Sequence, residues 1–321
     1  MRVRPIFLAL SWLAAAAAPG LAQVPPTYSE SASAEYVLMP VLVFDDRGRF
    51  VEGLNQKDFR VRVEKGEVTL DTFDRDDSAP VSFAFLLDTS GSMQLANKLE
   101  TAKNAIRSIV RSRQPGDDFA LLDFSEGEVR MVADFSSDPA RLLRGLYGLE
   151  AGGQTALFDA VAATPSRMVR GKNGKRAIVL FTDGVDNASK LDTAQMAEIL
   201  QQVSVPVYTV GMKNAAFDRV TEQERKQLSV DNLRMLASSS GGKMFLASGE
   251  KDMRPIAPKI CAEVRKQYLL GFTPTGQGEV KYRIIFVSMT KPGRWDVRVR
   301  RGYRGTAPAA AGLAKQERRP G

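Results

Sequence analysis

The 321-residue sequence contains no histidine and a single cysteine, Cys261. The lack of histidine excludes Ser-His-Asp and Cys-His catalytic sites and every histidine-ligated metal site. A single cysteine cannot form an intrachain disulfide, so the fold must depend on its hydrophobic core. Hydrophobic residues make up 44% and charged residues 26% of the chain, which is ordinary for a soluble globular protein. Apolar neighbours around Cys261 indicate a small, partly buried side chain and not a reactive thiol.

Long hydrophobic runs are also scarce, and the clearest one lies near the N-terminus. Arg2 and Arg4 precede a short apolar stretch at residues 6–18, and small residues suited to cleavage follow it. This pattern predicts a signal peptide at residues 1–22. An uncleaved membrane anchor is the alternative, but the stretch is short for a span and Pro19-Gly20 interrupts it. We therefore expect a periplasmic or secreted protein with no stable membrane span after cleavage.

Positive charge is in mild excess and is spread along the chain. The formal charge is +8, and it falls to +6 when the first 22 residues are removed. The densest basic stretch is residues 298–304, where Arg298 and Arg300 alternate with Val297 and Val299. Such alternation is typical of a strand with one exposed face, and charges on an edge strand discourage aggregation. We expect a structural role for these arginines and no nucleic-acid partner.

Polar residues follow two apolar runs that read as strands. Asp88-Thr89-Ser90-Gly91-Ser92 follows the run at 81–87, and Thr182-Asp183-Gly184 follows the run at 177–181. Continuously apolar runs are typical of strands buried on both faces of a parallel sheet. The carboxyl ends of such strands lie at one edge, where open α/β folds bind ligands. A glycine-rich loop ending at Thr155 can reach the same edge.

These segments together predict a metal site. The residues at i, i+2 and i+4 of an extended loop point the same way, so Asp88, Ser90 and Ser92 can converge on one point. With Thr155 and Asp183 they form an all-oxygen set that suits Mg²⁺ or Mn²⁺ and is poor for zinc or copper. Each motif alone is weak, because Asp, Ser and Gly are common turn residues and Thr155 could be only a helix N-cap. Their combination favours the metal site.

The combination resembles the metal-ion-dependent adhesion site (MIDAS) of the von Willebrand factor A (VWA) domain, whose pattern is Asp-x-Ser-x-Ser, a distant Thr and a Thr-Asp-Gly. The resemblance covers roughly residues 81–266. It implies that the two serines are direct hydroxyl ligands, that the two aspartates bind directly or through water, and that Thr155 joins when a partner engages. It also implies a protein partner that presents an Asp or Glu carboxylate. The flanks are similar to secreted, acidobacterial-type VWA-related proteins, a group from which no activity can be carried over to this chain.

The order of the predicted strands and helices indicates that one domain is inserted into another. Strands and helices alternate over residues 81–266, which predicts a doubly wound, mostly parallel, Rossmann-like sheet. Shorter strands at 35–80 and 267–304 are too few to be stable separately. We expect them to form one small β-sandwich around the inserted VWA domain, because domain termini often lie close together. Residues 305–321 are rich in Ala, Pro, Gly and charge and are expected to be a disordered tail.

Some local patterns lead to further expectations. Apolar residues at three- and four-residue steps from Leu95 predict a helix that begins just after Ser92, with its N-terminal amides beside the metal loop. Residues 68–73 read as one strand, and Asp117-Asp118 as a turn before a strand. Asp186-Asn187 would lie on the rim of the metal site, as ligand contacts or as an ordinary polar loop.

We expect a metal-dependent protein-binding module of the adhesion type that uses Mg²⁺ to bind a partner carboxylate. An alternative is an envelope assembly or scaffolding factor whose VWA face organises other subunits. A metal-dependent hydrolase is disfavoured, because no general base and no second metal cluster stand out. We therefore expect that the protein is not an enzyme.

Overall fold

The computed structural model describes residues 36–200, 203–212, 220–274 and 279–306. All described residues belong to one compact unit. The expected signal peptide at residues 1–22 lies outside the described residues. The expected tail at 305–321 lies outside them from residue 307 on, but its first residue, Gly305, is the last residue of a strand. Within the described ranges, no helix is long and apolar enough to cross a membrane.

A six-stranded sheet, in the order β10–β9–β8–β5–β6–β7, forms the centre of the α/β part. All neighbouring pairs are parallel except β6 with β7, so the predicted fold class with a mostly parallel sheet is confirmed. Every residue of β5 is buried, which explains its uninterrupted apolar run. The strands are β5 (Val81–Asp88), β6 (Asp118–Ser125), β7 (Glu128–Ser136), β8 (Lys175–Thr182), β9 (Val207–Met212) and β10 (Met244–Ala247).

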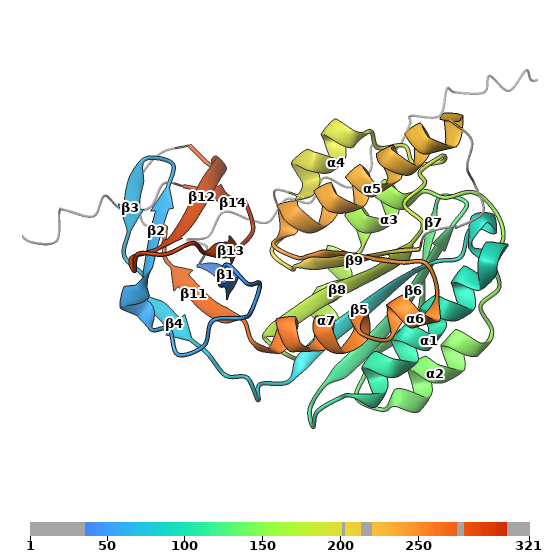
Figure 1. Cartoon of the computed structure of the whole chain (residues 1–321), viewed down its shortest axis with the longest axis horizontal. Coiled ribbons are helices and arrows are strands. Elements are labelled where there is room, and N and C mark those ends of the chain that lie inside the picture. The colour runs from blue at the N-terminus through green and yellow to red at the C-terminus, as the bar shows by residue number, and fades with distance from the viewer. Residues whose placement is uncertain (1–35, 201–202, 213–219, 275–278, 307–321) are drawn as a thin grey trace, which may run out of the picture. The chain divides into compact units, whose positions relative to one another are not determined.

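Helices cover both faces of this sheet (Figure 1). One apolar core joins the sheet to α1, α2, α6 and α7, and a second joins it to α3, α4 and α5. A capping box precedes α4, because Asp192 and Gln195 exchange side-chain-to-amide hydrogen bonds of 2.9 and 2.8 Å. The helices are α1 (Lys98–Arg111), α2 (Pro139–Tyr147), α3 (Leu157–Ala163), α4 (Thr193–Leu200), α5 (Val220–Ser240), α6 (Glu250–Met253) and α7 (Ile256–Arg265).

The strands before and after the α/β part share two further sheets, in the orders β13–β1–β11–β4 and β14–β12–β2–β3. N- and C-terminal segments pair directly, β1 with β11 and β2 with β12, and all eight strands surround one apolar core. The strands are β1 (Val37–Phe44), β2 (Phe59–Val63), β3 (Gly66–Val68), β4 (Thr72–Asp74), β11 (Tyr268–Phe272), β12 (Lys281–Met289), β13 (Asp296–Arg298) and β14 (Gly302–Gly305).

The two points where the chain passes between the sandwich and the α/β part lie together. Lys175, the first residue of β8, donates from its Nζ to the carbonyl oxygen of Asp76 and, at 2.6 Å, to that of Arg265. Asp76 precedes β5, and Arg265 ends α7. One lysine therefore joins the entry and the exit of the inserted segment.

Residues 68–73 do not form the single returning strand that their composition predicted. β3 pairs with β2 in one sheet, whereas β4 pairs with β11 in the other. Between them the Leu70 side chain is buried in the sandwich core. The chain therefore crosses from one sheet to the other at this point, and a pattern of alternating side chains does not reveal such a crossing.

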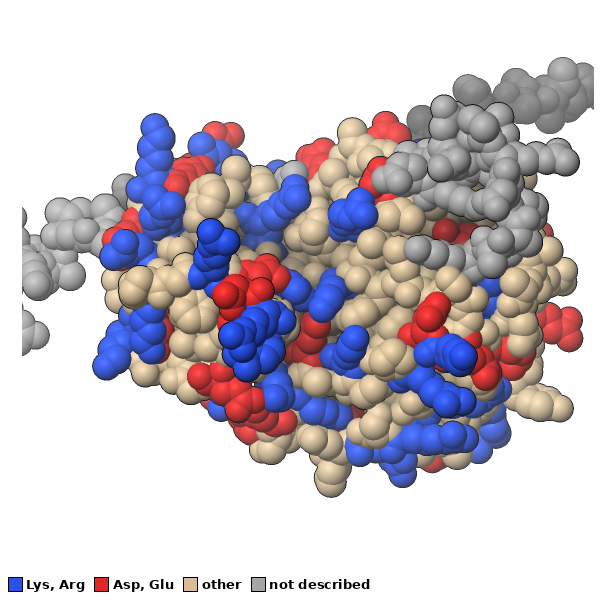
Figure 2. All heavy atoms as spheres, viewed as in Figure 1, with Lys and Arg blue, Asp and Glu red and all other residues tan. Residues whose placement is uncertain are grey.

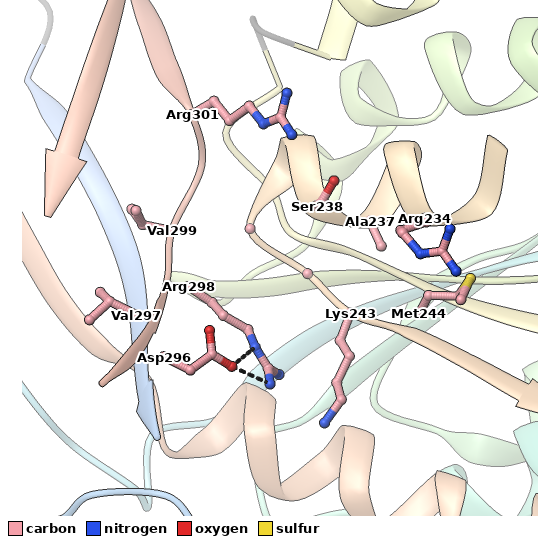
Figure 3. Close-up of a pocket in the computed structure, with 12 residues that line it drawn as sticks. Arg234, Ala237, Ser238, Lys243, Met244, Asp296, Val297, Arg298, Val299 and Arg301 are labelled. Carbon is pink, nitrogen blue, oxygen red and sulfur yellow. Dashed lines mark hydrogen bonds and ion pairs between the residues drawn. The ribbon is translucent and has the colours of Figure 1, made fainter. Parts of the chain in front are cut away.

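The prediction that the basic stretch 298–304 has an exposed face is wrong for its first arginines. The Arg298 side chain is 22% exposed, pairs with Asp296 at 2.7 Å and lies 4.2 Å from the centre of the Phe44 ring. Arg300 is buried. Figure 3 shows Arg298 beside Asp296 in a cavity of about 500 Å³ between β13 and the start of β10. On the face shown in Figure 2, positive and negative side chains are interspersed.

A protein limited to residues 80–266 is expected to fold alone, because the central sheet has two apolar cores of its own. Residues 35–75 are expected to stay unfolded without residues 267–304, since β1 and β2 have their main partners there. Circular dichroism during thermal unfolding of the two fragments tests both expectations. A cooperative transition in the 35–75 fragment would argue against one shared sandwich.

Candidate metal centre

The carboxyl ends of β5 and β8 lie side by side. The two strands are parallel neighbours, with Leu87 opposite Phe181. Their last residues, Asp88 of β5 and Thr182 of β8, therefore lie at the same edge of the sheet. The chain leaves β5 for β6 on one side and later returns to β8 on the other. Such a change of direction opens a crevice at the carboxyl edge, which is the usual ligand site of open α/β sheets. β5 thus runs from the junction with the sandwich to the edge at which the chain changes direction.

Asp88 is fully buried, and both of its oxygens accept hydrogen bonds. Its Oδ1 accepts from the Ser90 amide at 2.8 Å, and its Oδ2 accepts from the Thr182 hydroxyl at 2.5 Å. Burial raises the pKa of Asp88 to about 6, although the hydrogen bonds from Ser90 and Thr182 oppose that rise. The orienting role of Thr182 was not predicted, because the Thr of Thr-Asp-Gly reads as a turn residue.

The two serines of the motif are adjacent at the same edge. The Oγ atoms of Ser90 and Ser92 are 3.2 Å apart. Adjacent ligands of an octahedral ion at about 2.1 Å would be about 3.0 Å apart, so this spacing fits two ligands of one Mg²⁺. The two serine hydroxyls are therefore close together, and the Ser90 amide holds Asp88 in the same loop.

Backbone hydrogen bonds hold the Thr155 loop against the Asp88 loop. The Gly152 amide donates to the Thr89 carbonyl at 2.8 Å, and the Gly91 amide donates to the Gly153 carbonyl at 3.0 Å. Gly153 has φ +76°, and a Cβ there would lie 2.3 Å from the Glu126 side chain. Glycine is therefore required where the loop turns towards the motif.

Thr155 is also tied to the loop after β8. Its amide donates to Asn187 Oδ1 at 2.8 Å, and its carbonyl accepts from the amides of Asn187 and Ala188, each at 3.0 Å. Thr155 is not the N-cap of α3, whose N-cap position is Ala156. Asp186 instead accepts from the Phe158 amide at 3.0 Å. The rim residues Asp186 and Asn187 thus fasten the loops together, and the Thr155 loop is less free to shift than its glycines suggested.

The prediction that a helix begins directly after Ser92 is wrong. Residues 91–97 form a 3₁₀ segment that is broken at Leu95 and Ala96, and α1 begins only at Lys98. Ala96 and Asn97 have φ values of +51° and +56°, which no α-helix can contain. Leu95 is 48% exposed and does not belong to the apolar face of α1.

The late start of α1 places Lys98 in the site. Its Nζ lies 2.8 Å from Asp183 Oδ2, and the two side chains are only 6% and 7% exposed. The sequence carried no signal for this pair, because a lysine in a helical segment normally reads as a solvated residue. Asp183, a predicted metal ligand, is therefore held by a protein cation.

The donor set fits a hard divalent cation. Within the described residues, no group of three or more His, Cys, Asp or Glu side chains could hold a metal, so a site here must use hydroxyl ligands. The two carboxylates and the hydroxyls of Ser90, Ser92 and Thr155 provide such oxygens. The ammonium group of Lys98 against Asp183 shows that this edge already accommodates positive charge.

Comparison with known proteins agrees with the fold. Residues 83–185 match the family model described as the von Willebrand factor type A domain. The chain contains a VWA domain. An uncharacterized protein of Borreliella burgdorferi is 27% identical to this chain over 143 residues, which are 42% of this chain and 41% of that protein. The chain therefore spans less than half of that relative's length.

Solved structures are similar to this chain at low sequence identity. A von Willebrand factor type A protein from Catenulispora acidiphila superposes with a TM-score of 0.50 at 13% identity, over 79% of this chain and 74% of that one. The vWF domain of the type V pili tip protein Mfa5 from Porphyromonas gingivalis has a TM-score of 0.46 at 14% identity, over 64% of this chain and 99% of that domain.

Proposed function

We propose that the chain is a periplasmic or secreted, metal-dependent protein-binding module. Asp88, Ser90, Ser92, Thr155 and Asp183 would hold Mg²⁺ or Mn²⁺ at the carboxyl edge of the sheet. A partner protein would present an Asp or Glu carboxylate to the remaining metal position. The proposal includes no enzymatic activity.

The observation that carries the proposal is the hydrogen-bonded junction of three loops at one sheet edge. Thr182 joins the end of β8 to Asp88, and Gly152 and Gly153 join the Thr155 loop to the Asp88 motif. Asn187 closes the ring between the Thr155 loop and the loop after β8. A ligand that contacts all three loops would meet oxygens that the fold has already placed, which lowers the entropic cost of binding.

Bound Mg²⁺ would supply an exchangeable coordination position that attracts an anionic oxygen. The protein groups have separate tasks around it. Thr182 and the Ser90 amide orient the Asp88 carboxylate. The two carboxylates do not exceed the charge of a divalent ion, so the loaded site would still favour an incoming carboxylate.

A pulldown from the native envelope fraction, with Mg²⁺ or with EDTA, tests the proposal. We expect capture of partner proteins in Mg²⁺ and its loss in EDTA. Stable recovery of one envelope complex would indicate an assembly factor, whereas recovery of many unrelated surface proteins would indicate adhesion. Equal capture in Mg²⁺ and EDTA would show that recognition lies elsewhere, most simply on the sandwich.

Thr155→Ala is expected to weaken partner binding more than metal binding. The variant keeps both carboxylates and both serines, so Mg²⁺ would still bind at rest. The loss would arise when a partner carboxylate joins the metal and Thr155 becomes a ligand. Because the Thr155 backbone is tied to residues 187–188, this rearrangement would move both loops together.

Surface plasmon resonance against a captured partner, with calorimetry for Mg²⁺, measures the two effects separately. Thr290→Ala is a suitable control, since the Thr290 hydroxyl donates to the Lys57 carbonyl within the sandwich. We expect partner affinity to fall at least about tenfold for Thr155→Ala, which is about 1.4 kcal/mol, and to be unchanged for Thr290→Ala. Undiminished partner binding by Thr155→Ala in Mg²⁺ would exclude a role for this hydroxyl.

A further inference from the structure

Lys98 occupies a position that is unfavourable for a lysine unless a nearby anion explains it. It is the first residue of α1, where the helix dipole places partial positive charge. Its side chain is almost fully removed from solvent, which adds a desolvation cost. The contact with Asp183 Oδ2 at 2.8 Å offsets both costs. Lys98 and Asp183 therefore form a specific pair at the candidate metal centre.

The charge of Lys98 opposes metal loading. With both carboxylates ionised, Asp88, Asp183 and Lys98 carry a net charge of −1, whereas the two carboxylates alone would carry −2. A divalent ion that approaches Asp183 is repelled by the ammonium group, and low solvent access leaves this repulsion poorly screened. The pair must loosen or share Asp183 before that carboxylate can act as a ligand.

We infer that Lys98 is a built-in counter-ion that competes with the divalent metal for Asp183 and sets the metal concentration at which the site loads. The inference rests on the proposed metal site. It adds a residue outside the predicted ligand set and gives that residue a regulatory effect. At low divalent-ion concentration Lys98 neutralises the charge of Asp183, and at higher concentration the bound metal neutralises it instead.

Replacement of Lys98 in the full chain tests the inference, with Mn²⁺ as the probe. Lys98→Gln removes the charge and keeps a hydrogen-bond donor near Asp183, whereas Lys98→Arg keeps the charge. Lys103→Gln is a matched control, because Lys103 lies on the same helix, is only 5% exposed and pairs with Glu100 at 2.8 Å. Mn²⁺ dissociation constants are measured by electron paramagnetic resonance or calorimetry.

We expect Lys98→Gln to bind Mn²⁺ at least about fivefold more tightly than the wild type, because the repulsive charge is gone. Lys98→Arg and Lys103→Gln are expected to stay within about twofold of the wild type. Equal or weaker Mn²⁺ binding by Lys98→Gln would overturn the inference, and so would equal tightening by Lys98→Arg. If Lys98→Gln is unstable without metal, a larger Mn²⁺-induced rise in its melting temperature than in the wild type supports the inference, and an equal rise opposes it.

The same titrations separate this inference from the metal site itself. If the wild type and Lys98→Gln bind Mn²⁺ equally well, the metal site is supported and the inference that Lys98 competes with the metal is wrong. If neither protein binds Mn²⁺, the proposed metal site is wrong, and the inference about Lys98 is wrong as well. If Lys98→Gln binds Mn²⁺ and the wild type does not, Lys98 holds the site closed at the concentrations tested, which supports the inference in its strongest form.

Discussion

Asp88→Ala is expected to lower Mg²⁺ affinity at least about 100-fold, since even residues that only orient a metal ligand typically contribute 10- to 100-fold. Asp88 follows directly on the central strand, and both of its oxygens are oriented by protein donors. Removing it would leave Asp183 as the only carboxylate of the proposed set, and Lys98 already neutralises that one. Calorimetry in Mg²⁺ measures the loss.

The same replacement is expected to leave the fold intact. Burial disfavours the ionised form of Asp88 and raises its pKa to about 6, so removing this carboxylate also removes a desolvation cost, which partly offsets the loss of the hydrogen bonds from the Ser90 amide and the Thr182 hydroxyl. Asp46→Ala is a suitable control, because Asp46 is exposed in the turn after β1. Equal Mg²⁺ affinity in the wild type and Asp88→Ala, with both folded by circular dichroism, would disprove the metal site.

The second large effect is expected at Asp117, where alanine should destabilise the protein by roughly 3–5 kcal/mol, the usual cost of breaking a buried ion pair on one side. Asp117 and Arg265 are paired through two hydrogen bonds of 3.2 and 2.6 Å, and both residues are buried. Asp117 also accepts from the amides of Val81 and Gln114, each at 2.8 Å. Removing it would leave a buried guanidinium and two amides without these acceptors.

Urea denaturation in excess EDTA measures this effect without metal linkage, and Asp46→Ala again provides the control. The double variant Asp117→Ala/Arg265→Met should recover part of the loss, because it also removes the stranded charge. If Asp117→Ala lowers the free energy of unfolding by less than about 1 kcal/mol, the Asp117–Arg265 pair does not hold the end of α7 to the start of β5. Mg²⁺ affinity of the folded variant should be unchanged, since Asp117 is at the opposite end of β5 from Asp88.

Local sequence patterns were sufficient to predict the central strands and to propose the metal ligands. The runs that became β5 and β8 are apolar at every position because both faces of the sheet are covered by helices. The carboxyl ends of parallel strands lie at one edge of a sheet, so the ends of β5 and β8 could be placed together before the structure was known. The composition of the Asp88 motif then pointed to oxygen ligation.

Features that depend on distant residues were not predictable in this way. Lys98 and Asp183 are 85 residues apart, and Asp117 and Arg265 are 148 apart. Asp117 had been interpreted as a simple turn residue, and Lys98 as part of a regular helix. A helical repeat of apolar residues also cannot show that Ala96 and Asn97 adopt the left-handed conformation and that the helix begins only after them. Pairing across the fold decides the role of such residues, and a single sequence does not contain that pairing.

The position of β5 has a mechanical consequence. Its eight residues span about 26 Å from the sandwich junction to Asp88. A partner that pulls on the metal loop would therefore load β5 along its length, and its hydrogen bonds to β6 and β8 would be sheared together instead of opening one at a time. The opposite end of β5 lies where Lys175 joins the entry and exit of the inserted segment. Tension on the proposed binding face would thus pass along β5 into the sandwich.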